Sequence, residues 1–440
     1  MVASEMPDPR DTLRARRMNL QQYGVVALCV AINMIDGYDI LALSLAGTAL
    51  KGEWALGDAA FGTLLSMNLI GMAVGALGVS PVADQWGRRP AILSCLLFMS
   101  AGMALSALSQ GFPAMALGRL VTGIGIGGMT STAGTLALEY ASLKRREFVA
   151  STVAAAYPVG TILGSWVALA VLDGFGWRGI FWAGAGLSAL LFPIALLCLP
   201  ESLDFLLARQ PKGALDATNR VLRRMGVPPI AALPPLPEGE ARGSSVLHDV
   251  TRPAHLAELA KLCLAHALNM FAWYYIINWG PPLVSQAAGL DEAGARYAAW
   301  VSYGGIAGGM TAGYLCGTVG VRRMMWFTMI ALAALIALFG QFAGDRAALV
   351  VIAPLVGAAL FGSATANWLT IAYAFPAQLR ATGLGLATTA GRVGSIFGPI
   401  TGGILLGEGL TVAAVCAAMA IPALLSAATF SRARRVEPGK

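Results

Sequence analysis

The sequence predicts an all-α membrane protein with twelve transmembrane helices in two six-helix halves, and three observations support this fold class. Of its 440 residues, 57% are hydrophobic and only 12% are charged, whereas a soluble domain carries about 25% charged residues. The apolar residues form long blocks, such as Ala91 to Ala107 and Met324 to Phe342, that can cross a hydrocarbon core of about 30 Å. An internal repeat and a one-sided distribution of basic residues complete the evidence.

The apolar blocks give the expected spans in order. The first block holds two aspartates and is longer than the core of a signal peptide, so we interpret it as a spanning helix. The expected helices are 23–47, 60–83, 90–109, 113–138, 149–172, 177–199, 256–288, 296–316, 324–343, 347–372, 381–405 and 410–430.

The internal repeat predicts two halves in parallel orientation. The stretch Tyr157-Pro-Val-Gly-Thr-Ile-Leu-Gly-Ser matches Gly391-Arg-Val-Gly-Ser-Ile-Phe-Gly-Pro, and its glycines Gly160 and Gly394 lie 234 residues apart. The loops around Gly87 and Gly320 match at nearly the same spacing. Such duplication is typical of transporters whose substrate site lies between two halves near the bilayer midplane.

We expect residues 1–199 to form the first half and residues 255–440 the second. Residues 200–254 form the long polar segment between them, which we interpret as a cytoplasmic linker. A short amphipathic helix is expected within it near Asp216 to Met225.

The basic residues predict the orientation of the chain. With the spans assigned alternately to two sides, 24 of the 30 Lys and Arg residues fall on the side of both termini and four on the other. This asymmetry follows the positive-inside rule, so both termini are expected in the cytoplasm and the chain in the inner membrane. The net charge of +7 therefore reflects topology, and a nucleic-acid partner is not expected.

Two carboxylates in the first span are the strongest candidates for function. Asp36 lies about 20 Å along the helix that starts at Tyr23, and Asp39 follows one turn later on the same face. Charged groups at this depth are costly and mark functional sites by default. A carboxyl group that gains and loses a proton suits proton coupling, and the alternative is a buried structural pair.

Two arginines also fall within predicted spans. Arg392 lies about 18 Å beyond Arg380, too deep for its side chain to reach the interface. Its guanidinium is shaped to bind a carboxylate substrate through two hydrogen bonds, and the alternative is a salt bridge to Asp36 or Asp39. Arg119 lies about 9 Å from the outer end of its span, where snorkelling to the interface is equally compatible with the sequence.

Aromatic and amide side chains in the seventh, eighth and tenth spans are candidates for the substrate site. Rings could stack on a planar substrate and amides could bind its hydroxyl groups, whereas an interfacial aromatic belt is the alternative. His266 is interpreted as a hydrogen-bonded helix residue, with a proton relay as the second reading. The candidates are Trp273, Tyr274, Asn278, Tyr303, Asn367 and Trp368.

The remaining motifs favour neither an enzyme nor a metal protein. All six cysteines lie in apolar blocks without metal-ligand spacing, so neither a metal site nor a cofactor is expected. No pattern of nucleophile and base indicates catalysis. The glycine run Gly123-Ile-Gly-Ile-Gly-Gly128 has no preceding strand, so helix packing is expected there rather than dinucleotide binding.

Four stretches of the chain resemble the aromatic acid:proton symporters of the major facilitator superfamily. They are Asp36-Gly-Tyr-Asp39, Ala83-Asp-Gln-Trp-Gly-Arg-Arg89, Gly118-Arg-Leu-Val-Thr-Gly-Ile-Gly-Ile-Gly127, and Arg380-Ala-Thr-Gly-Leu-Gly followed by Gly391-Arg-Val-Gly-Ser-Ile. The resemblance spans nearly the whole chain. It implies the major facilitator fold.

The resemblance also implies roles for individual residues. Proton coupling is expected at Asp36, Asp39, Arg119 and Glu139. Control of the cytoplasmic gate is expected at Asp84, Gly87, Arg88, Arg89, Arg146 and Arg380. The sequence departs from the family pattern at Ser142, where proline is frequent, and at Gly317 or Thr318, where an acidic residue is common.

The expected function is proton-driven import of an aromatic carboxylate, with protons and the lipid bilayer as partners and a monomer as the working unit. A proton-coupled carrier of a non-aromatic acid or sugar is the first alternative, and a drug efflux antiporter is the second. The antiporter motif Gly-Pro-x-x-Gly-Gly does not occur in span 149–172, although Gly398-Pro-Ile-Thr-Gly-Gly403 imitates it in a later span. A membrane receptor is the alternative from a different class.

Overall fold

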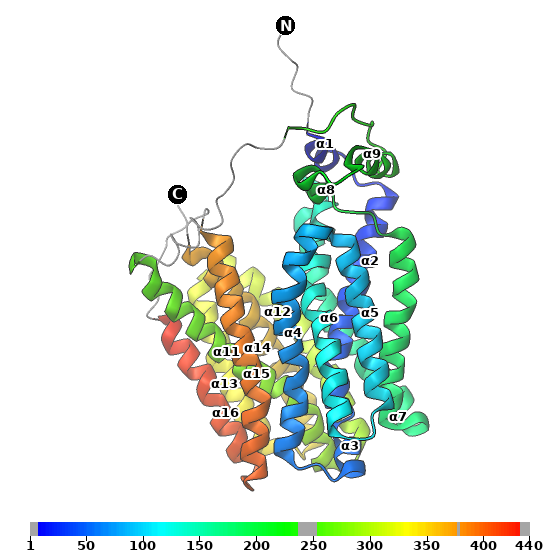
Figure 1. Ribbon diagram of the computed structural model, residues 1–440. Helices are drawn as coiled ribbons and strands as arrows, with labels where there is room; N and C mark the ends of the chain where they lie inside the picture. The colour runs from blue at the N-terminus through cyan, green and yellow to red at the C-terminus, as the bar shows by residue number, and fades with distance from the viewer. Residues whose placement is uncertain (1–7, 236–252, 376–378, 432–440) are drawn as a thin grey trace.

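The computed structural model describes residues 8–235, 253–375 and 379–431, and within these ranges the chain forms helices and no strand (Figure 1). The first part of the chain forms α1 (Pro9–Ala15), α2 (Leu20–Leu45), α3 (Gly47–Trp54), α4 (Asp58–Trp86), α5 (Arg88–Leu108), α6 (Phe112–Glu139), α7 (Arg146–Cys198), α8 (Leu203–Arg209) and α9 (Ala214–Arg224). The second part forms α11 (Pro253–Ala288), α12 (Asp291–Leu315), α13 (Val321–Phe342), α14 (Arg346–Ala374), α15 (Arg380–Gly407) and α16 (Val412–Ser431).

The helices confirm the predicted transmembrane architecture. Eight segments of the described chain are long and apolar enough to cross a membrane. Two of these segments each contain two spans. In one, α7 breaks at Gly176, where φ is +61°. In the other, α12 and α13 are joined through a short π-helical turn. With α11 and α15, which have 36 and 28 residues, they match the twelve predicted spans in order.

Several helices begin at local sequence signals. Asn19 forms a capping box with Gln22 at the start of α2, so two backbone N–H groups find acceptors there. The Asp345 carboxylate accepts hydrogen bonds from two backbone N–H groups at the start of α14. Pro113 occupies the first turn of α6, where the missing N–H costs no helical hydrogen bond.

The spanning helices pack as two groups. In the first, α2 packs on α7 and α4 on α6; in the second, α11 packs on α15 and α12 on α14 (Figure 1). The predicted packing role of the glycine run is confirmed, because Gly123 and Gly127 of α6 lie directly against the α4 backbone at Asn68 and Met72. A stretch that imitates a dinucleotide-binding loop is thus a helix contact.

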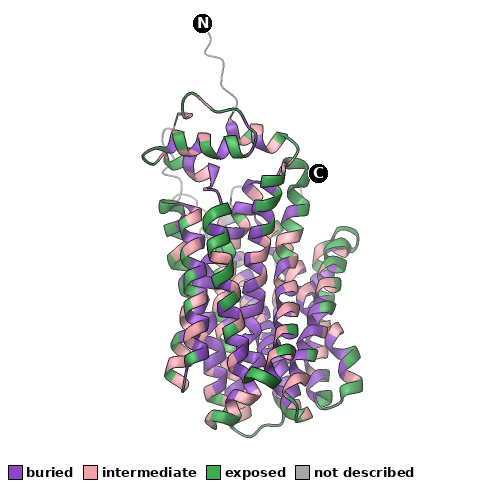
Figure 2. Ribbon diagram, turned by 90° about the vertical axis from the view of Figure 1, so that its right-hand side faces the viewer, coloured by how far each residue is buried: buried purple, intermediate pink, exposed green. Residues whose placement is uncertain are grey.

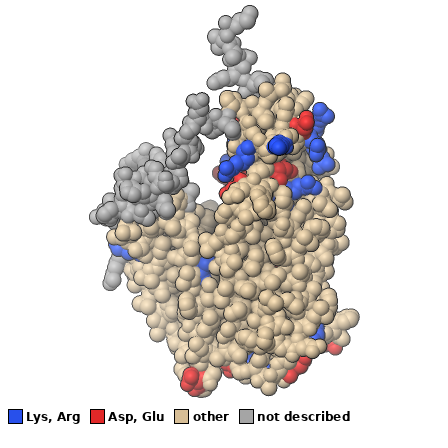
Figure 3. Space-filling view, viewed as in Figure 1, with Lys and Arg blue, Asp and Glu red and all other residues tan. Residues whose placement is uncertain are grey.

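Exposed side chains on the bundle are largely apolar. Phe327 on α13 and Leu197 on α7 are 68% and 74% exposed, while buried residues fill the interior of each group (Figure 2). In Figure 3 most of the visible charges gather near the two ends, and the broad band between them is uncharged apart from one basic group at mid-height. A band of this kind is the surface that a bilayer requires.

One end of the bundle carries the short helices of the linker, and we call it the α8–α9 end; the opposite end, where α3 lies, is the α3 end (Figure 1). The predicted amphipathic helix is confirmed as α9, which buries Val221 and Leu222 and exposes Arg223 and Arg224. The short helices α1, α3 and α8 were not predicted. The remainder of the predicted linker, 236–252, lies outside the described residues.

The two groups meet along a seam formed by α4 with α15 and by α7 with α12. Ser66 donates a hydrogen bond to the Ile396 carbonyl at 2.7 Å, and the Thr161 and Ser302 hydroxyls lie 2.6 Å apart. Over the described residues, the hydrogen bonds that cross the seam lie between mid-helix and the α3 end. The seam is therefore closed toward the α3 end.

Candidate functional site

The two aspartates of α2 lie in different surroundings. Asp36 and Asp39 are 3% and 0% exposed, which confirms that both carboxylates are buried in the bundle. Asp36 Oδ2 accepts a hydrogen bond from the Thr130 hydroxyl of α6 at 3.0 Å. Both Asp39 carboxylate oxygens lack a hydrogen-bond partner among the described residues. A carboxyl group in such a position is less costly when it carries a proton.

Arg119 lies beside Asp39 in the interior of the first helix group. Its side chain is fully buried, so it does not snorkel to the interface. Arg119 Nη2 donates to the backbone carbonyl of Asp39 at 2.9 Å, and Nη1 lies 3.2 Å from the Met103 sulfur. The guanidinium also faces the Phe181 ring at 5.7 Å. It therefore binds the Asp39 backbone and leaves the carboxylate unbonded.

Arg392 lies on α15 at the seam, opposite α4. Its guanidinium contacts the Met72 sulfur at 3.8 Å, and the ion pairs of the described chain do not include Arg392. Asp36, Tyr157 and Tyr274 are close enough to interact with its charge. The salt bridge to Asp36 or Asp39 considered from the sequence is thus not formed in this state, and the guanidinium can accept a ligand.

Four rings from three helices form an aromatic cluster beside Arg392. Trp273 and Tyr274 come from α11, Tyr157 from α7 and Phe361 from α14. The Trp273 ring lies 4.8 Å from Tyr274, 5.7 Å from Phe361 and 6.1 Å from Tyr157, measured between centroids. Tilted and edge-on pairs at these distances are favourable. The aromatic cluster joins both helix groups at mid-helix.

Polar atoms without partners occur in the aromatic cluster and on α4 and α11. The Tyr157 hydroxyl and Trp273 Nε1 are buried and lack hydrogen bonds within the described chain, as do both side-chain polar atoms of Asn68 and of Asn269. A buried polar group without a partner costs about 1–3 kcal/mol, so a group of them indicates a place for water or ligand. We call the aromatic cluster, these polar groups, Asp36 and Arg392 the central site.

His266 and Asn367 extend the central site on the side of the second helix group. Asn367 Nδ2 lies 2.6 Å from His266 Nδ1, and His266 also packs against Gly391, next to Arg392. Trp368 is 52% exposed and lies two turns beyond Phe361 on the same face of α14. Its ring therefore belongs to the open part of the seam rather than to the buried cluster.

Two other predicted substrate residues, Asn278 and Tyr303, form hydrogen bonds across the seam. Asn278 donates to the Tyr274 carbonyl of its own helix, and its amide oxygen lies 3.5 Å from the Ser44 hydroxyl. Tyr303 is 46% exposed and accepts a hydrogen bond from Trp166 across the seam at 3.0 Å. Both side chains therefore join the two helix groups across the seam.

Sequence reasoning missed four residues that the structure brings together with the predicted ones, namely Asn68, Thr130, Tyr157 and Phe361. Asn68 and Thr130 are small polar residues inside glycine-rich spans, which carry no periodic signal. Tyr157 was detectable, because the internal repeat pairs it with Gly391, the neighbour of Arg392.

The predicted gate residues meet at the α8–α9 end. Arg88 Nε forms a salt bridge with Glu139 Oε1 at 2.8 Å, and Ser202 donates to Glu139 Oε2 at 2.5 Å. Glu201 Oε1 accepts from the backbone N–H groups of Arg88 and Arg89 at the start of α5. Glu139 thus lies with the gate residues, about 13 Å along α6 from the Thr130 that binds Asp36.

The other gate residues make fewer contacts. Gly87 has φ +107°, which favours glycine, and a Cβ at this position would meet the Glu201 carboxylate. Asp84 and Arg146 are exposed. Arg380 begins α15, and its side chain lies outside the described residues.

The chain is similar over most of its length to known transporters. Residues 26–399 match the family model described as Major Facilitator Superfamily. The chain is 26% identical to the 4-hydroxybenzoate transporter PcaK of Pseudomonas aeruginosa, over 97% of this chain and 96% of the relative. It is 27% identical to the gallate transporter of Pseudomonas putida, over 96% and 93% of the two chains.

The fold also matches solved structures. A partially occluded inward-open structure of the xylose transporter XylE from E. coli superposes with a TM-score of 0.72 at 15% identity, covering 96% of this chain and 100% of that chain. At this identity the likeness shows the fold alone. Because the family model covers most of the length, the chain belongs to the Major Facilitator Superfamily.

Proposed function

We propose that this protein imports an aromatic carboxylate together with protons by alternating access. The observation that carries the proposal is Arg392, a guanidinium without an acidic partner among the described residues that lies at mid-helix near Tyr157 and Tyr274 of the aromatic cluster. The 4-hydroxybenzoate and gallate transporters, which are similar over nearly their whole lengths, act on substrates of this chemistry.

The central site fits each part of such a substrate. Arg392 binds the carboxylate through two parallel hydrogen bonds, and the aromatic cluster holds the ring by offset or edge-on contacts. The amides of Asn68 and Asn269, which have no hydrogen-bond partner in the described part of the chain, bind ring hydroxyl groups. A substrate that satisfies these buried groups removes the cost of leaving them unbonded.

Protons enter through the two aspartates of α2. Asp36 lies close enough to Arg392 to interact with its charge, so protonation of Asp36 leaves the guanidinium free to bind an anionic substrate. Asp39 of α2 and Arg119 of α6 form a second buried pair of groups. Through this pair, protonation of Asp39 is coupled to the packing of α2 on α6. No cofactor is needed, because the proton gradient supplies the energy.

Orientation follows from the basic residues. The α8–α9 end faces the cytoplasm and both termini lie on that side, in the inner membrane. The structure is then inward-facing, because its seam is closed toward the α3 end. Residues 1–199 and 255–440 rock about the central site, residues 200–254 connect them, and the residues around Arg88 close the cytoplasmic side in the opposite state. A single chain performs the cycle.

The first test is uptake of a panel of radiolabelled aromatic acids into proteoliposomes, with and without an imposed proton gradient. Accumulation of at least one acid is expected, with loss of accumulation on addition of a protonophore. Unlabelled benzoates should compete with that acid. If an aliphatic acid or a sugar is accumulated and benzoates do not compete, the aromatic assignment fails, and net export would indicate an efflux antiporter.

A further inference from the structure

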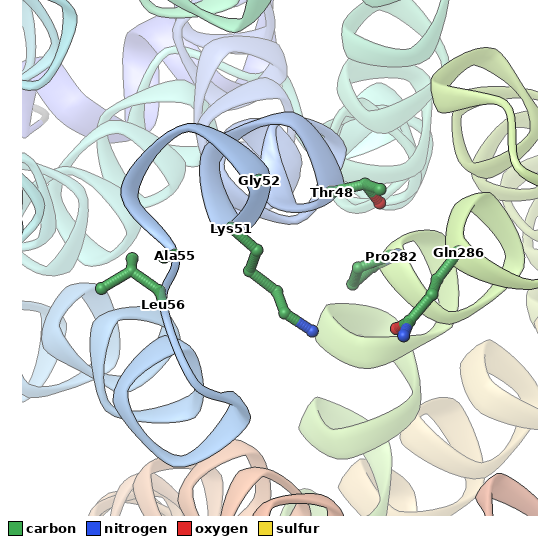
Figure 4. Close-up of a pocket in the computed structure, with 7 residues that line it drawn as sticks. All are labelled: Thr48, Lys51, Gly52, Ala55, Leu56, Pro282 and Gln286. Atoms are coloured by element: carbon green, nitrogen blue, oxygen red, sulfur yellow. The ribbon is translucent and has the colours of Figure 1, made fainter.

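A pocket of about 280 Å³ lies between α3 and α11 at the α3 end, away from the central site. Figure 4 shows the Lys51 ammonium and the Gln286 amide directed into the same space from the two helix groups, with Thr48 and Pro282 beside them. Leu56 contributes further apolar surface. No function proposed so far uses this pocket.

The polar groups of the pocket suit a small anion. Lys51 is bonded to Asp58, and its ammonium also lies 6.0 Å from the Trp279 ring. An ammonium carries three N–H donors, so it can bind a second acceptor while it remains near Asp58. The Thr48 hydroxyl is buried and lacks a hydrogen-bond partner among the described residues. The Lys51 ammonium and the Gln286 amide thus converge beside apolar surface, as expected of a small-molecule site.

The pocket lies over the closed part of the seam. Beneath it, the Phe61 ring meets the Trp279 ring edge-on at 5.5 Å, and Gly47 lies against Phe61 and Pro282. Gly52, Ala55 and Gln286 are exposed and form its outer rim. A ligand in the pocket would thus lie between the outer solvent and the contacts that must separate before the central site opens to that side.

Charge selects the ligand class. The α3 end is rich in carboxylates, including Glu53 and Glu292, and both are already bonded to arginines, Arg178 and Arg296. Those ion pairs involve residues that do not line the pocket, whereas Lys51 does. Lys51 is paired as well, with Asp58, but it is the cation that lines the pocket, so an anion that enters the pocket meets its ammonium.

We propose that this pocket is an outer binding site for the aromatic carboxylate, where Lys51 binds the carboxylate before the seam opens. The inference rests on the proposed function and adds a residue that controls uptake from outside. The substrate carboxylate and Asp58 compete for the same ammonium. Loss of Lys51 and loss of Asp58 should therefore have opposite effects on the external substrate concentration required for uptake.

Initial uptake rates in whole cells, measured against the external concentration of the best acid in the panel, test this competition. Lys51→Gln should raise the external KM about fivefold, as for an exposed ion pair, with kcat nearly unchanged. Asp58→Asn should lower KM. Arg296→Gln is the matched control, because it removes a cation from an exposed ion pair at the same end but outside the pocket; its KM should not change.

A purely structural role of the ion pair gives a different result. If Lys51 and Asp58 only hold the seam closed, both single variants break the same bond and shift KM in the same direction, which would overturn the outer site. The double variant Lys51→Gln/Asp58→Asn contains no unpaired charge, and it should keep the raised KM of Lys51→Gln. Recovery of wild-type KM in the double variant would also refute the outer site.

The two proposals fail in distinguishable ways. Equal KM values for wild type, Lys51→Gln and Asp58→Asn would remove the outer site and leave the proposed function intact. Efflux of preloaded substrate through the α8–α9 end provides a second measurement, in which the internal KM of Lys51→Gln should match wild type. Failure of the wild type to take up any acid in the panel would instead refute the proposed function.

Discussion

At the scale of single residues, the buried charges are the most informative feature. A charged side chain inside the membrane is expensive unless it is bonded or neutralised, yet Asp39 and Arg392 make few polar contacts in this state. Their structural surroundings do not explain why these residue types occupy these positions. A transport cycle does, because protons and substrate provide the missing partners at different steps.

Asp39→Asn tests the proton step. The amide imitates the protonated carboxyl in shape and charge, so the protein should fold and still exchange substrate across the membrane. Accumulation against a gradient should be lost, because no proton can be released from this position. Counterflow and gradient-driven uptake in the same proteoliposomes separate the two activities. Full accumulation by this variant would remove Asp39 from the proton path.

Arg392→Lys tests how the carboxylate is bound. Lysine keeps the positive charge but loses the planar pair of donors, so affinity should fall by about 10- to 100-fold, the equivalent of about 1.5–3 kcal/mol. Equilibrium binding of the radiolabelled acid to purified protein measures the loss directly. An unchanged Kd would mean that Arg392 serves only as a point charge or lies outside the substrate site.

At the scale of helices, small residues set the distances between backbones. Gly127 of α6 faces the α4 backbone at Met72, and Gly357 of α14 faces the α12 backbone at Val301. The sequence predicts such contacts as glycines inside apolar blocks, so the spans and their close packing followed from composition. The short helix α3 did not, because its eight residues are too few to show a period and its role depends on contacts with α11.

Gly127→Val tests the α4–α6 contact. A larger side chain would collide with the α4 backbone, and overpacking of this kind costs about 1–3 kcal/mol. The Tm of the purified protein in detergent should fall by several degrees. Gly24→Ala is the control, since a Cβ at Gly24 meets no atom within 4 Å, and its Tm should match the wild type. Equal Tm values for both variants would show that α6 does not pack on α4 as described.

At the scale of the whole molecule, the sequence predicted the architecture but not the conformational state. Opposite states of a transporter share the same helices and differ by small free energies, so no residue pattern specifies which seam contacts form. For the same reason, the sequence grouped Asn278 and Tyr303 with the substrate residues, whereas here they link the two helix groups at the seam. Asp36, Asp39 and Arg392 were predictable, because the free-energy cost of burying a charged side chain does not depend on the conformational state.

The inward-facing assignment makes the last prediction, which uses cysteines placed at two depths of α4 and α15. Gly385 lies two turns before Arg392 on the same face of α15, and a Cβ there meets no atom within 4 Å. Ser66 of α4 lies in the closed part of the seam, is fully buried and donates to Ile396. In a background with Cys198 and Cys263 replaced by serine, Gly385→Cys should react with a membrane-impermeant thiol reagent applied from the α8–α9 side, and Ser66→Cys should not.

An imposed outward-directed substrate gradient that drives the cycle should slow labelling at Gly385→Cys, because the α8–α9 side is closed for part of each turnover. Rapid labelling of Ser66→Cys from the α3 side, with protection of Gly385→Cys, would show that the resting protein faces outward instead.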